Sequence, residues 1–529
     1  MYQYFFCFIF LFLTAFVQAQ TAPKREMRAV WIATVANTDF PTKKNLHPYL
    51  QQDEYSRIIR QHKAIGINTV IVQVRPATDA FYASDKELWS EWLTGKQGSA
   101  PKPFYDPLDF MIEEAHRNGM EFHAWFNPYR AVFDTTKRQD AINPEHITNR
   151  KPEWFIQYGK NKYFNPAIPQ VRNYIIDIIT DVVKRYPIDA VHFDDYFYPY
   201  PIANVAFDDQ KSFEKYGEGF ANINDWRRQN INLLIEGVAN SIKQIKPKVK
   251  FGVSPFGVWR NQRDDRQGSA TTTGTTSYDY LYADVRLWLK NNWIDYVVPQ
   301  IYFHHQYKPA PYQKLADWWA ANSFGKHLYI GQAAYKIGSR TDTLWQDLSE
   351  MPKQLRFNRQ CQNIQGSIFF SSKSLINKTI SFSDSLKNNF YKYTALVPPM
   401  SWKDSVRPNA PTDLFASKSY QAVYLTWQKP SRAKDGDEAT YYVIYRFLKE
   451  ENINLEDASK IIGISRGQGE FFVDKTAKIG NDYRYIVTAV DAIHNESLPS
   501  NAVLISYPEG TWLDFFKVVL DLYFKKVKI

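Results

Sequence analysis

The sequence is poor in cysteine, and this limits how the protein can be stabilised. Cys7 and Cys361 are its two cysteines in 529 residues. Cys7 lies in an apolar N-terminal segment that we expect to be removed, which excludes an intramolecular disulfide from the remaining chain. The fold is therefore expected to depend on burial of apolar side chains, for which a hydrophobic content of 44% is sufficient.

Charged residues are missing from the first 19 positions. This segment is a continuous apolar run that ends in Val17-Gln18-Ala19. A small residue at the end of such a run is typical of a secretory signal, although the usual Lys or Arg before the run is absent. We predict a signal peptide at residues 1–19, with a retained membrane anchor as the alternative. The protein is expected to be exported, either periplasmic or associated with the cell envelope.

An excess of basic residues gives the chain a formal charge of +10, from 65 Lys and Arg against 55 Asp and Glu. This excess favours anionic surroundings such as cell-wall polymer or lipid headgroups. The basic residues are mostly scattered, and no basic run suited to a nucleic-acid groove is present. We therefore expect no nucleic-acid partner.

Eight short apolar runs alternate with amphipathic segments, a pattern typical of a closed parallel barrel. The chain is also longer than the ~300 residues at which a single core stops growing, so a second domain is expected. The eight runs are residues 27–35, 68–75, 121–127, 189–195, 250–256, 294–302, 327–332 and 366–371. The amphipathic segments include residues 51–65, 106–118, 170–186, 225–245, 278–291 and 343–360. We predict an α/β fold, a (β/α)8 TIM barrel, over residues 26–395.

Long connections follow the second, third, fourth and fifth runs, whereas the connections from helix to next run are short. The extra length therefore gathers at the C-terminal ends of the strands, where barrel enzymes carry their active sites. A cleft walled by such loops is better suited to a polymer than to a small metabolite.

The composition changes after residue 396, where a linker is predicted to reach residue 407. Residues 408–507 contain short alternating runs such as Tyr441-Tyr-Val-Ile-Tyr445, spaced as in a small all-β sandwich. This region resembles a fibronectin type III domain, with Trp427 as the early core tryptophan and Tyr483 or Tyr485 in the late tyrosine position. We expect a spacer or docking module without a catalytic role.

The C-terminal tail, residues 508–529, is apolar and aromatic and ends in Phe-Lys-Lys-Val-Lys-Ile. As a helix it would be amphipathic with a basic end, which allows peripheral contact with a membrane. Packing against one of the two domains is the alternative.

The fourth run carries the strongest chemical signal, Asp189-Ala-Val-His-Phe-Asp-Asp-Tyr-Phe-Tyr-Pro199. Alternation along the strand places His192 and Asp194 inside the barrel, and Asp195 follows at its rim. Two adjacent carboxyl groups can hold different pKa values, so that one stays protonated. A protonated carboxyl can donate to a glycosidic oxygen. Asp79, in the loop after the second run, is a further candidate carboxylate.

Other side chains near the run ends supply donors and aromatic platforms around the same mouth. We expect substrate contacts from Arg75, Tyr82, His123, Trp125, Asn127, Tyr129, Arg130, His192, Tyr196, Tyr198, Trp259, Arg260 and Gln300. His123 and His192 are isolated rather than clustered, so no metal is implied and no cofactor is expected.

Several long motifs occur in order along the predicted barrel. They are Arg28-Ala-Val-Trp31, Val74-Arg-Pro76, Asp79-Ala-Phe-Tyr82, Tyr105-Asp-Pro-Leu108, His123-Ala-Trp-Phe-Asn-Pro-Tyr-Arg130, His192-Phe-Asp-Asp-Tyr-Phe-Tyr-Pro199, Ser254-Pro-Phe-Gly257 and Pro299-Gln-Ile-Tyr302. Together they resemble the glycosyl-hydrolase-like family 10 proteins. The resemblance implies a barrel glycosidase that acts on cell-wall glycan, notably peptidoglycan strands stripped of their peptides.

Two mechanisms are compatible with these residues. A retaining nucleophile at the end of the seventh run is disfavoured, because that stretch reads Tyr329-Ile-Gly-Gln-Ala-Ala-Tyr335. An inverting pair, with carboxyl groups roughly 6.5–9.5 Å apart, would combine Asp194 or Asp195 with Asp79. In the substrate-assisted route of chitinase-like barrels, Asp194, Asp195 and Tyr302 would fill the catalytic positions. The terminal Glu of the chitinase pattern would fall at Tyr196.

We therefore predict an exported glycoside hydrolase that acts on peptidoglycan-type polysaccharide by carboxylate acid/base catalysis. The alternative is a non-catalytic barrel that binds glycan through the same aromatic side chains. Esterase chemistry is less supported, since the sequence contains no Gly-x-Ser-x-Gly motif.

Overall fold

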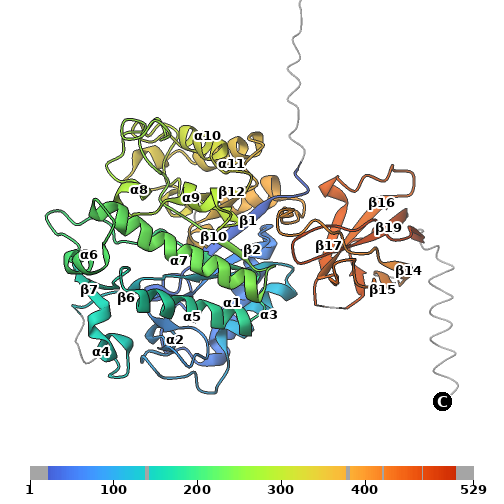
Figure 1. Ribbon diagram of the computed structural model, residues 1–529. Coiled ribbons are helices and arrows are strands. Elements are labelled where there is room, and N and C mark those ends of the chain that lie inside the picture. The colour runs from blue at the N-terminus through green and yellow to red at the C-terminus, as the bar shows by residue number, and fades with distance from the viewer. Residues whose placement is uncertain (1–21, 137–141, 377–381, 420–421, 468, 508–529) are drawn as a thin grey trace, which may run out of the picture.

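The computed structural model describes residues 22–136, 142–376, 382–419, 422–467 and 469–507 (Figure 1). The signal peptide predicted at residues 1–19 and the amphipathic tail predicted at residues 508–529 lie outside the described residues. No helix within the described ranges is both long enough and apolar enough to cross a membrane.

Eight parallel strands close into a barrel in the order β1-β13-β12-β11-β10-β9-β5-β2. The strands are β1 (Met27–Ile32), β2 (Thr69–Arg75), β5 (Glu121–Phe126), β9 (Ala190–Phe193), β10 (Lys250–Val253), β11 (Tyr296–Val297), β12 (His327–Gln332) and β13 (Gly366–Phe369). Each lies inside one of the eight predicted runs. The (β/α)8 barrel predicted from the sequence is therefore confirmed.

Helices surround the barrel and bury their apolar sides against the outer faces of its strands (Figure 1). They are α1 (Pro48–Ala64), α3 (Pro107–Arg117), α5 (Pro169–Arg185), α7 (Ile223–Ile245), α8 (Ser277–Tyr280), α9 (Val285–Lys290), α10 (Tyr312–Ala321), α11 (Glu350–Gln360) and α12 (Ser372–Leu375). Helix α3 shows the local reason for such a start, since the Asp106 carboxylate accepts the Leu108 N–H and Pro107 occupies the first turn.

The helix predicted at residues 278–291 is wrong in one respect, because the structure divides it into α8 and α9. Tyr282 lies between them with a φ of 54°. This left-handed backbone cannot continue a right-handed helix. Helix α10 was not among the predicted segments.

Shorter elements build the loops at the C-terminal end of the barrel. They are β3 (Asp79–Ala80), β4 (Leu88–Trp89), α2 (Glu91–Thr94), β6 (Arg130–Val132), α4 (Ile147–Arg150), β7 (Phe155–Tyr158), β8 (Asn161–Phe164) and α6 (Gln210–Tyr216). Strands β6, β8 and β7 form a small antiparallel sheet in the long connection after β5. The long loops predicted from the sequence therefore carry structure of their own.

The interior of the barrel is largely polar and aromatic. On β9 the side chains of Val191 and Phe193 join the outer core, whereas Ala190 belongs to the inner cluster. The inner cluster also contains Trp31 and Tyr296. Buried polar groups share this space, namely Glu121, His123, His192 and Lys250, each at most 2% exposed. The barrel is therefore cross-linked from inside by hydrogen bonds as well as by packing.

The C-terminal region is an all-β sandwich of two antiparallel sheets, with strand orders β14-β15-β18 and β17-β16-β19-β20. Its strands are β14 (Thr412–Lys418), β15 (Val423–Gln428), β16 (Tyr441–Leu448), β17 (Ile461–Ser465), β18 (Phe471–Asp474), β19 (Asn481–Val490) and β20 (Val503–Tyr507). Trp427 packs edge-on against Tyr442 in its core, and the Tyr485 hydroxyl donates to Asp474 at 2.8 Å. The sandwich is as predicted, and its fibronectin type III character stays a prediction.

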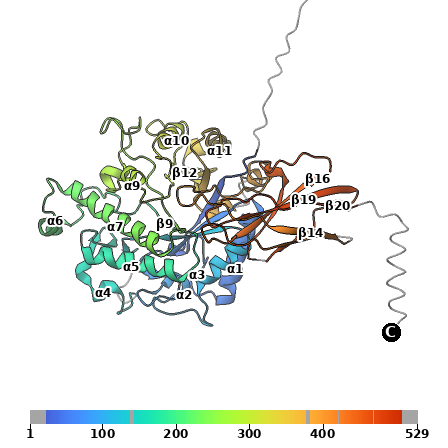
Figure 2. The ribbon, with the colours of Figure 1, turned by 45° about the vertical axis from the view of Figure 1, so that its right-hand side comes forward.

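The sandwich packs directly against the N-terminal ends of the barrel strands (Figure 2). Arg466 of the sandwich pairs with Asp189 at 2.8 Å, and Glu496 pairs with Lys24 at 2.7 Å. The segment 396–407, expected as a linker, places Val397 and Met400 in the inner cluster of the barrel. The expected spacer is therefore in close contact with the barrel that precedes it.

We expect the Arg466–Asp189 pair to stabilise the folded chain. Burial disfavours the charge of Asp189, but Arg466 and His116 outweigh that effect and hold the pKa of its carboxyl well below the usual range. Arg466→Met should therefore lower the free energy of unfolding by about 2 kcal/mol at pH 7, as measured by urea unfolding followed by tryptophan fluorescence.

The same substitution at Arg432 is the control, because its pair with Glu438 is exposed and should contribute little. A carboxyl whose pKa is lower in the folded protein than in the unfolded chain stabilises the fold above the unfolded pKa, near 4. This stabilisation is lost as the pH falls from the unfolded pKa toward the folded one. The two variants should therefore converge in acid. Equal effects at pH 7 would contradict the assignment.

Candidate active site

A cavity of about 400 Å³ opens at the C-terminal ends of the barrel strands. This volume lies within the range of ligand-binding pockets. The cavity is lined by Trp31, Ala33, Val35, Thr38, Gln73, Trp125, Arg130, Phe133, Asp194, Asp195, Tyr196, Tyr200, Ser254, Gln300, Tyr302, Tyr335 and Phe370. These residues come from all eight strands or from the loops that follow them, as expected for the mouth of a barrel enzyme.

Asp194 is held in place by a relay of side-chain amides. The Asn127 amide donates to Asp194 Oδ2, and Gln73 Nε2 donates to Asn127 Oδ1 at 2.5 Å. Gln73 Oε1 in turn accepts the Thr34 backbone N–H at 2.9 Å. The other oxygen of Asp194 receives the Tyr196 N–H at 3.4 Å. The carboxyl is thus anchored on one oxygen and loosely held on the other.

Asp195 has stronger support for a negative charge. The Tyr200 hydroxyl donates to its Oδ2 atom, and the Gln300 amide also acts to lower the pKa of this carboxyl. Gln300 is oriented by a bond from Nε2 to the Ser254 carbonyl oxygen at 2.9 Å. Donors that bond to the charged form of a carboxyl favour that form.

The electrostatics of the pair separate the two groups. Burial raises the pKa of Asp194 to about 7; Arg130 opposes this rise and the neighbouring charge of Asp195 adds to it. Burial also raises the pKa of Asp195, against the hydrogen bond from Tyr200. Two carboxyls this close cannot easily both ionise. The pair therefore retains one proton near neutral pH, and the geometry places it on Asp194.

Aromatic rings form much of the cavity wall. Tyr302 lies with its ring centroid 6.0 Å from Tyr335 and 6.4 Å from Phe370. Arg130 stacks over Tyr196, with its guanidinium carbon 4.6 Å from the ring centroid. Rings of this kind can stack on the apolar faces of sugars while the carboxyls and amides bond to hydroxyl groups.

The cavity brings together part of the predicted site. Its members among the predicted residues are Asp194, Asp195, Tyr302, Trp125, Arg130, Tyr196 and Gln300. Sequence reasoning did not assign site roles to Trp31, Gln73, Tyr200, Ser254, Tyr335 and Phe370, which also line it. Trp31 could have been found, because it alternates with Ala29 and Ala33 on the inward face of β1.

Asp79 does not line the cavity that holds Asp194, contrary to the expected inverting pair. It lies on β3 and lines a separate cavity with Gln97 and His146. Burial raises its pKa to about 8, against a hydrogen bond to Ser90. Asp79 therefore faces the packing of the loops and not the barrel mouth.

Arg75 and three of the expected tyrosines likewise do not line the cavity. Arg75 is 1% exposed and forms a two-pronged ion pair with Glu87, at 2.6 and 2.7 Å. Tyr82, Tyr129 and Tyr198 are buried in the outer core. These four side chains are buried and do not reach the cavity.

The remaining predicted contacts also lie away from the cavity lining. Asn127 sits behind Asp194, and His123 and His192 are buried in the barrel interior. Trp259 stacks on Trp318 at 5.8 Å, and Arg260 pairs with Asp279 at 2.9 Å. Asn127 bonds directly to Asp194, and His192 contacts Trp31 and Ser254, which line the cavity.

In the described part of the chain, one group of acidic residues is close enough together to hold a metal ion, namely Asp404, Asp435 and Asp437. Lys248 lies 3.8 Å from Asp404 and also pairs with Asp437, so it offsets part of the negative charge of the cluster. Asp435 and Asp437 lie in the β15–β16 connection of the sandwich, and none of the three lines the cavity that holds Asp194. We assign it no function.

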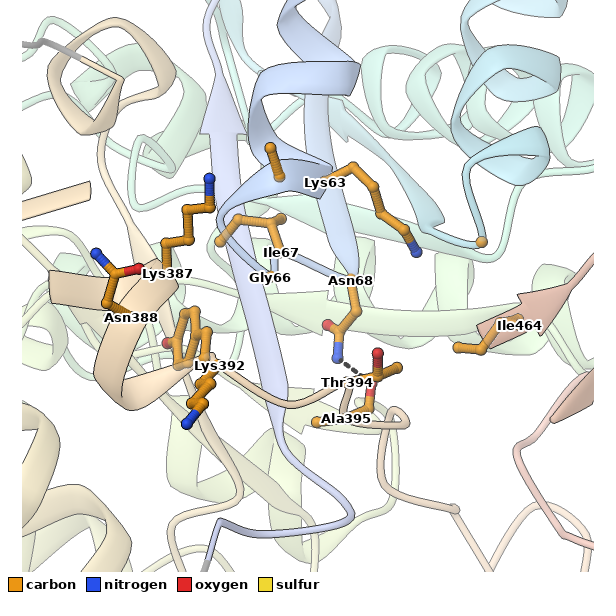
Figure 3. A pocket seen from close by; sticks show the side chains of 13 residues that line it. Lys63, Gly66, Ile67, Asn68, Lys387, Asn388, Lys392, Thr394, Ala395 and Ile464 are labelled. Atoms are coloured by element: carbon orange, nitrogen blue, oxygen red, sulfur yellow. Dashed lines mark hydrogen bonds between the residues drawn. The ribbon is translucent and has the colours of Figure 1, made fainter. Parts of the chain in front are cut away.

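A second cavity, of about 300 Å³, lies at the opposite end of the barrel between α1 and the sandwich (Figure 3). Its lining includes Lys63, Lys387 and Lys392, whose amino groups point away from one another in Figure 3. None of the described residues that line it is acidic. It offers no acid/base pair.

Comparison with known proteins places the chain in a family. The family model described as Glycosyl hydrolase-like 10 matches residues 26–347. A protein of Bacillus subtilis (strain 168) named glycosyl hydrolase YngK is 44% identical over 487 residues, covering 91% of this chain and 94% of its own. Glycosyl hydrolase DigH of Escherichia coli (strain K12) is 40% identical over 365 residues, covering 65% of this chain and 82% of its own.

A solved structure, the PgaB (BpsB) glycoside hydrolase domain from Bordetella bronchiseptica, is similar at 12% identity with a TM-score of 0.45. The alignment covers 69% of this chain and 98% of that domain. This likeness is too slight to bear on the reaction.

Titration should reveal the shared proton of the pair. We expect the Asp194 carboxyl to titrate near pH 7 in the wild type, as measured by 13C NMR of labelled aspartate. Asp195→Asn removes a neighbouring negative charge and should lower the pKa of Asp194. Asp79→Asn, outside the cavity, is the control and should leave it unchanged.

The raised pKa of Asp194 also affects the stability of the fold. A carboxyl whose folded pKa is raised destabilises the fold as the pH rises from the unfolded pKa, near 4, toward the folded value. Asp194→Asn should therefore be more stable than the wild type above pH 7 and similar to it below pH 4. A wild-type Asp194 that titrates near 4 would contradict this assignment.

Proposed function

The chain belongs to the Glycosyl hydrolase-like 10 family, and from this premise we propose that it is an exported glycoside hydrolase that cleaves cell-wall glycan. The observation that carries the proposal is the pair Asp194 and Asp195, 5% and 3% exposed, at an aromatic-walled cavity in the barrel mouth. A pair that keeps one proton near neutral pH has the two protonation states that glycosidic cleavage requires.

In the proposed reaction Asp194 is the general acid. Its raised pKa keeps a proton available for the leaving glycosidic oxygen, whose bond to the anomeric carbon then breaks. Asp195, which accepts the Tyr200 hydroxyl, remains negative and stabilises the positive charge that develops on the sugar.

The nucleophile is proposed to come from the substrate or from water. On β12 the inward position next to the mouth is Gly331, and Gln332 points outward to bond Gln354 at 3.1 Å. A carboxylate nucleophile at this strand end is therefore not available. A 2-acetamido group oriented by Asp195 fits the substrate-assisted route, with Tyr302 beside the reacting sugar.

The proposed substrate is peptidoglycan-type glycan, and in particular strands without peptides. N-acetylated sugars supply the acetamide that the substrate-assisted route needs. The charge of +10 suits an anionic cell wall, and the predicted signal at residues 1–19 would take the protein there. The preference for peptide-free strands rests on the family resemblance.

A barrel that binds glycan without cleaving it is the second candidate, and the missing β12 carboxylate favours it. Two buried carboxyls are costly to the fold, however, and a binder of neutral sugars has no need of them. The pair therefore favours catalysis.

Activity should depend on both carboxyls of the pair. We expect purified protein, residues 20–529, to release fragments from peptide-free peptidoglycan strands, with products identified by mass spectrometry. Asp194→Asn and Asp195→Asn should each lower kcat by about 100-fold or more, because each removes a group that acts on the reacting bond.

Asp79→Asn is the matched control, since it makes the same change at a buried aspartate outside the cavity, and it should retain activity. Binding of strands without products in every protein would support the glycan-binding alternative. Equal loss in the Asp79 variant would contradict the assignment of the pair.

A further inference from the structure

A turn of the sandwich inserts into the base of the barrel. It connects β19 to β20, and the Asp491 carboxylate holds it by accepting the backbone N–H groups of Ile493 and Asn495 at 2.8 and 2.9 Å. Ile493 is fully buried in the inner cluster of the barrel, and His494 beside it is 3% exposed. His494 has a φ of 71°, a left-handed conformation that is uncommon for a residue with a side chain. The turn thus presents the imidazole at the barrel axis.

His494 starts a continuous chain of buried hydrogen bonds. Its Nε2 atom lies 2.6 Å from Glu121 Oε1, and Glu121 Oε2 lies 3.0 Å from His123 Nε2. His123 Nδ1 lies 2.9 Å from the Tyr296 hydroxyl, which lies 3.0 Å from His192 Nδ1. These five side chains come from the sandwich and from β5, β11 and β9, so the chain runs along the inside of the barrel.

The upper end of the chain reaches the cavity. His192 Nε2 lies 3.3 Å from the Trp31 indole nitrogen and 3.1 Å from Ser254 Oγ. Trp31 and Ser254 both line the cavity. The Ser254 carbonyl oxygen accepts the amide of Gln300 at 2.9 Å, and Gln300 lines the same cavity as Asp194 and Asp195. A side chain of the sandwich is therefore connected by hydrogen bonds to the lining of the cavity that holds the catalytic pair.

Donor and acceptor chemistry allows one direction of donation along this chain of hydrogen bonds. An indole N–H can only donate, so His192 Nε2 accepts and its Nδ1 carries the proton. That proton is donated to the Tyr296 oxygen, whose own hydrogen is then donated to His123 Nδ1. His123 Nε2 therefore donates to Glu121. His494 Nε2 donates to the other oxygen of the same carboxylate, and its Nδ1 accepts from the Tyr441 hydroxyl at 2.9 Å.

Packing leaves the chain little freedom to rearrange. A Cβ atom on Gly252 would lie 2.0 Å from Cζ of Tyr296, so only glycine leaves room for this ring. The His192 and Tyr296 rings are stacked, with centroids 5.9 Å apart. Lys250 also pairs with Glu121, so the carboxylate keeps a cationic partner if His494 is replaced.

We propose that His494 is a positioning residue for the glycan-cleaving site, which it orders through Glu121, His123, Tyr296 and His192. This inference rests on the proposed function and adds a role for the sandwich in it. By holding the His192 ring at Nδ1, the chain of hydrogen bonds sets the positions of Trp31 and Ser254, which contact Nε2. The sandwich is on this view a part of the active enzyme.

Interruption of the chain at a single atom tests the proposal. Tyr296→Phe removes the bridging hydroxyl, and Tyr329→Phe is the matched control. Tyr329 is also fully buried on the inner face of the neighbouring strand, but its hydroxyl bonds to His327, outside the chain. We expect Tyr296→Phe to lower kcat by about tenfold with little change in KM, and Tyr329→Phe to leave both unchanged.

The sandwich end is tested in the same full-length protein. His494→Ala should lower kcat to a similar degree, and His494→Gln, which keeps an N–H donor, should restore part of it. Because both substitutions interrupt the same chain of hydrogen bonds, the double variant His494→Ala with Tyr296→Phe should be no slower than the slower single variant. Losses that multiply, or equal losses in Tyr329→Phe, would overturn the proposal.

A spectroscopic readout separates this proposal from the proposed function. 15N NMR of labelled histidine distinguishes the two neutral tautomers, and His192 is assigned by the loss of its signals in His192→Gln. We expect His192 protonated on Nδ1 in the wild type. His494→Ala should keep this tautomer, because Trp31 still donates to Nε2, but should shift the 15N resonance of Nδ1 as its hydrogen bond to Tyr296 changes. An unshifted resonance would overturn the positioning role even if the enzyme is active. A shifted resonance in a protein that cleaves no glycan would contradict the proposed function alone.

Discussion

The buried carboxylate of Glu121 at the base of the barrel is the interaction on which much of this structure depends. It is 2% exposed, and a charge in such a place is very costly unless it is paired and hydrogen-bonded. Lys250 of β10 and His494 of the sandwich bond to its Oε1 atom, and His123 bonds to its Oε2 atom. The carboxylate therefore links the sandwich to the barrel, and it is the acceptor at the base of the hydrogen-bonded chain inside the barrel.

Two kinds of buried carboxyl occur along the same barrel axis, and their surroundings give them opposite properties. Burial disfavours ionisation of Glu121, but Lys250, His494 and His123 outweigh it and hold its pKa well below the usual range. Burial of Asp194 is opposed mainly by Arg130, and the charge of Asp195 acts against ionisation, so the pKa of Asp194 rises to about 7. The same functional group thus serves as a structural anion at the base and as an acid at the mouth.

The connection between these two ends is made of neutral donors and acceptors. Burial lowers the pKa of His192 well below its usual value, so this imidazole is uncharged in the chain. A neutral imidazole has one donor and one acceptor, and it therefore transmits the orientation of its partners instead of adding a charge. The fold in this way combines a hydrogen-bonded interior with a cavity whose charged lining residues, among those that the structure describes, are Asp194, Asp195 and Arg130.

The sequence by itself determined the barrel, the end at which the site lies and the central carboxyl pair. These follow from local rules, because strand alternation assigns a side chain to one of two faces and loop lengths differ between the two ends of a barrel. Alternation does not tell how deeply a side chain is buried. Arg75 and Tyr198 are therefore expected at the mouth from the sequence, although both are buried in the structure. The role of Asp79 depended on the path of a loop, which local pattern does not specify. Only the tertiary structure could join His494 to Glu121, which are 373 residues apart in the chain, because contact between distant segments is decided by how whole domains pack.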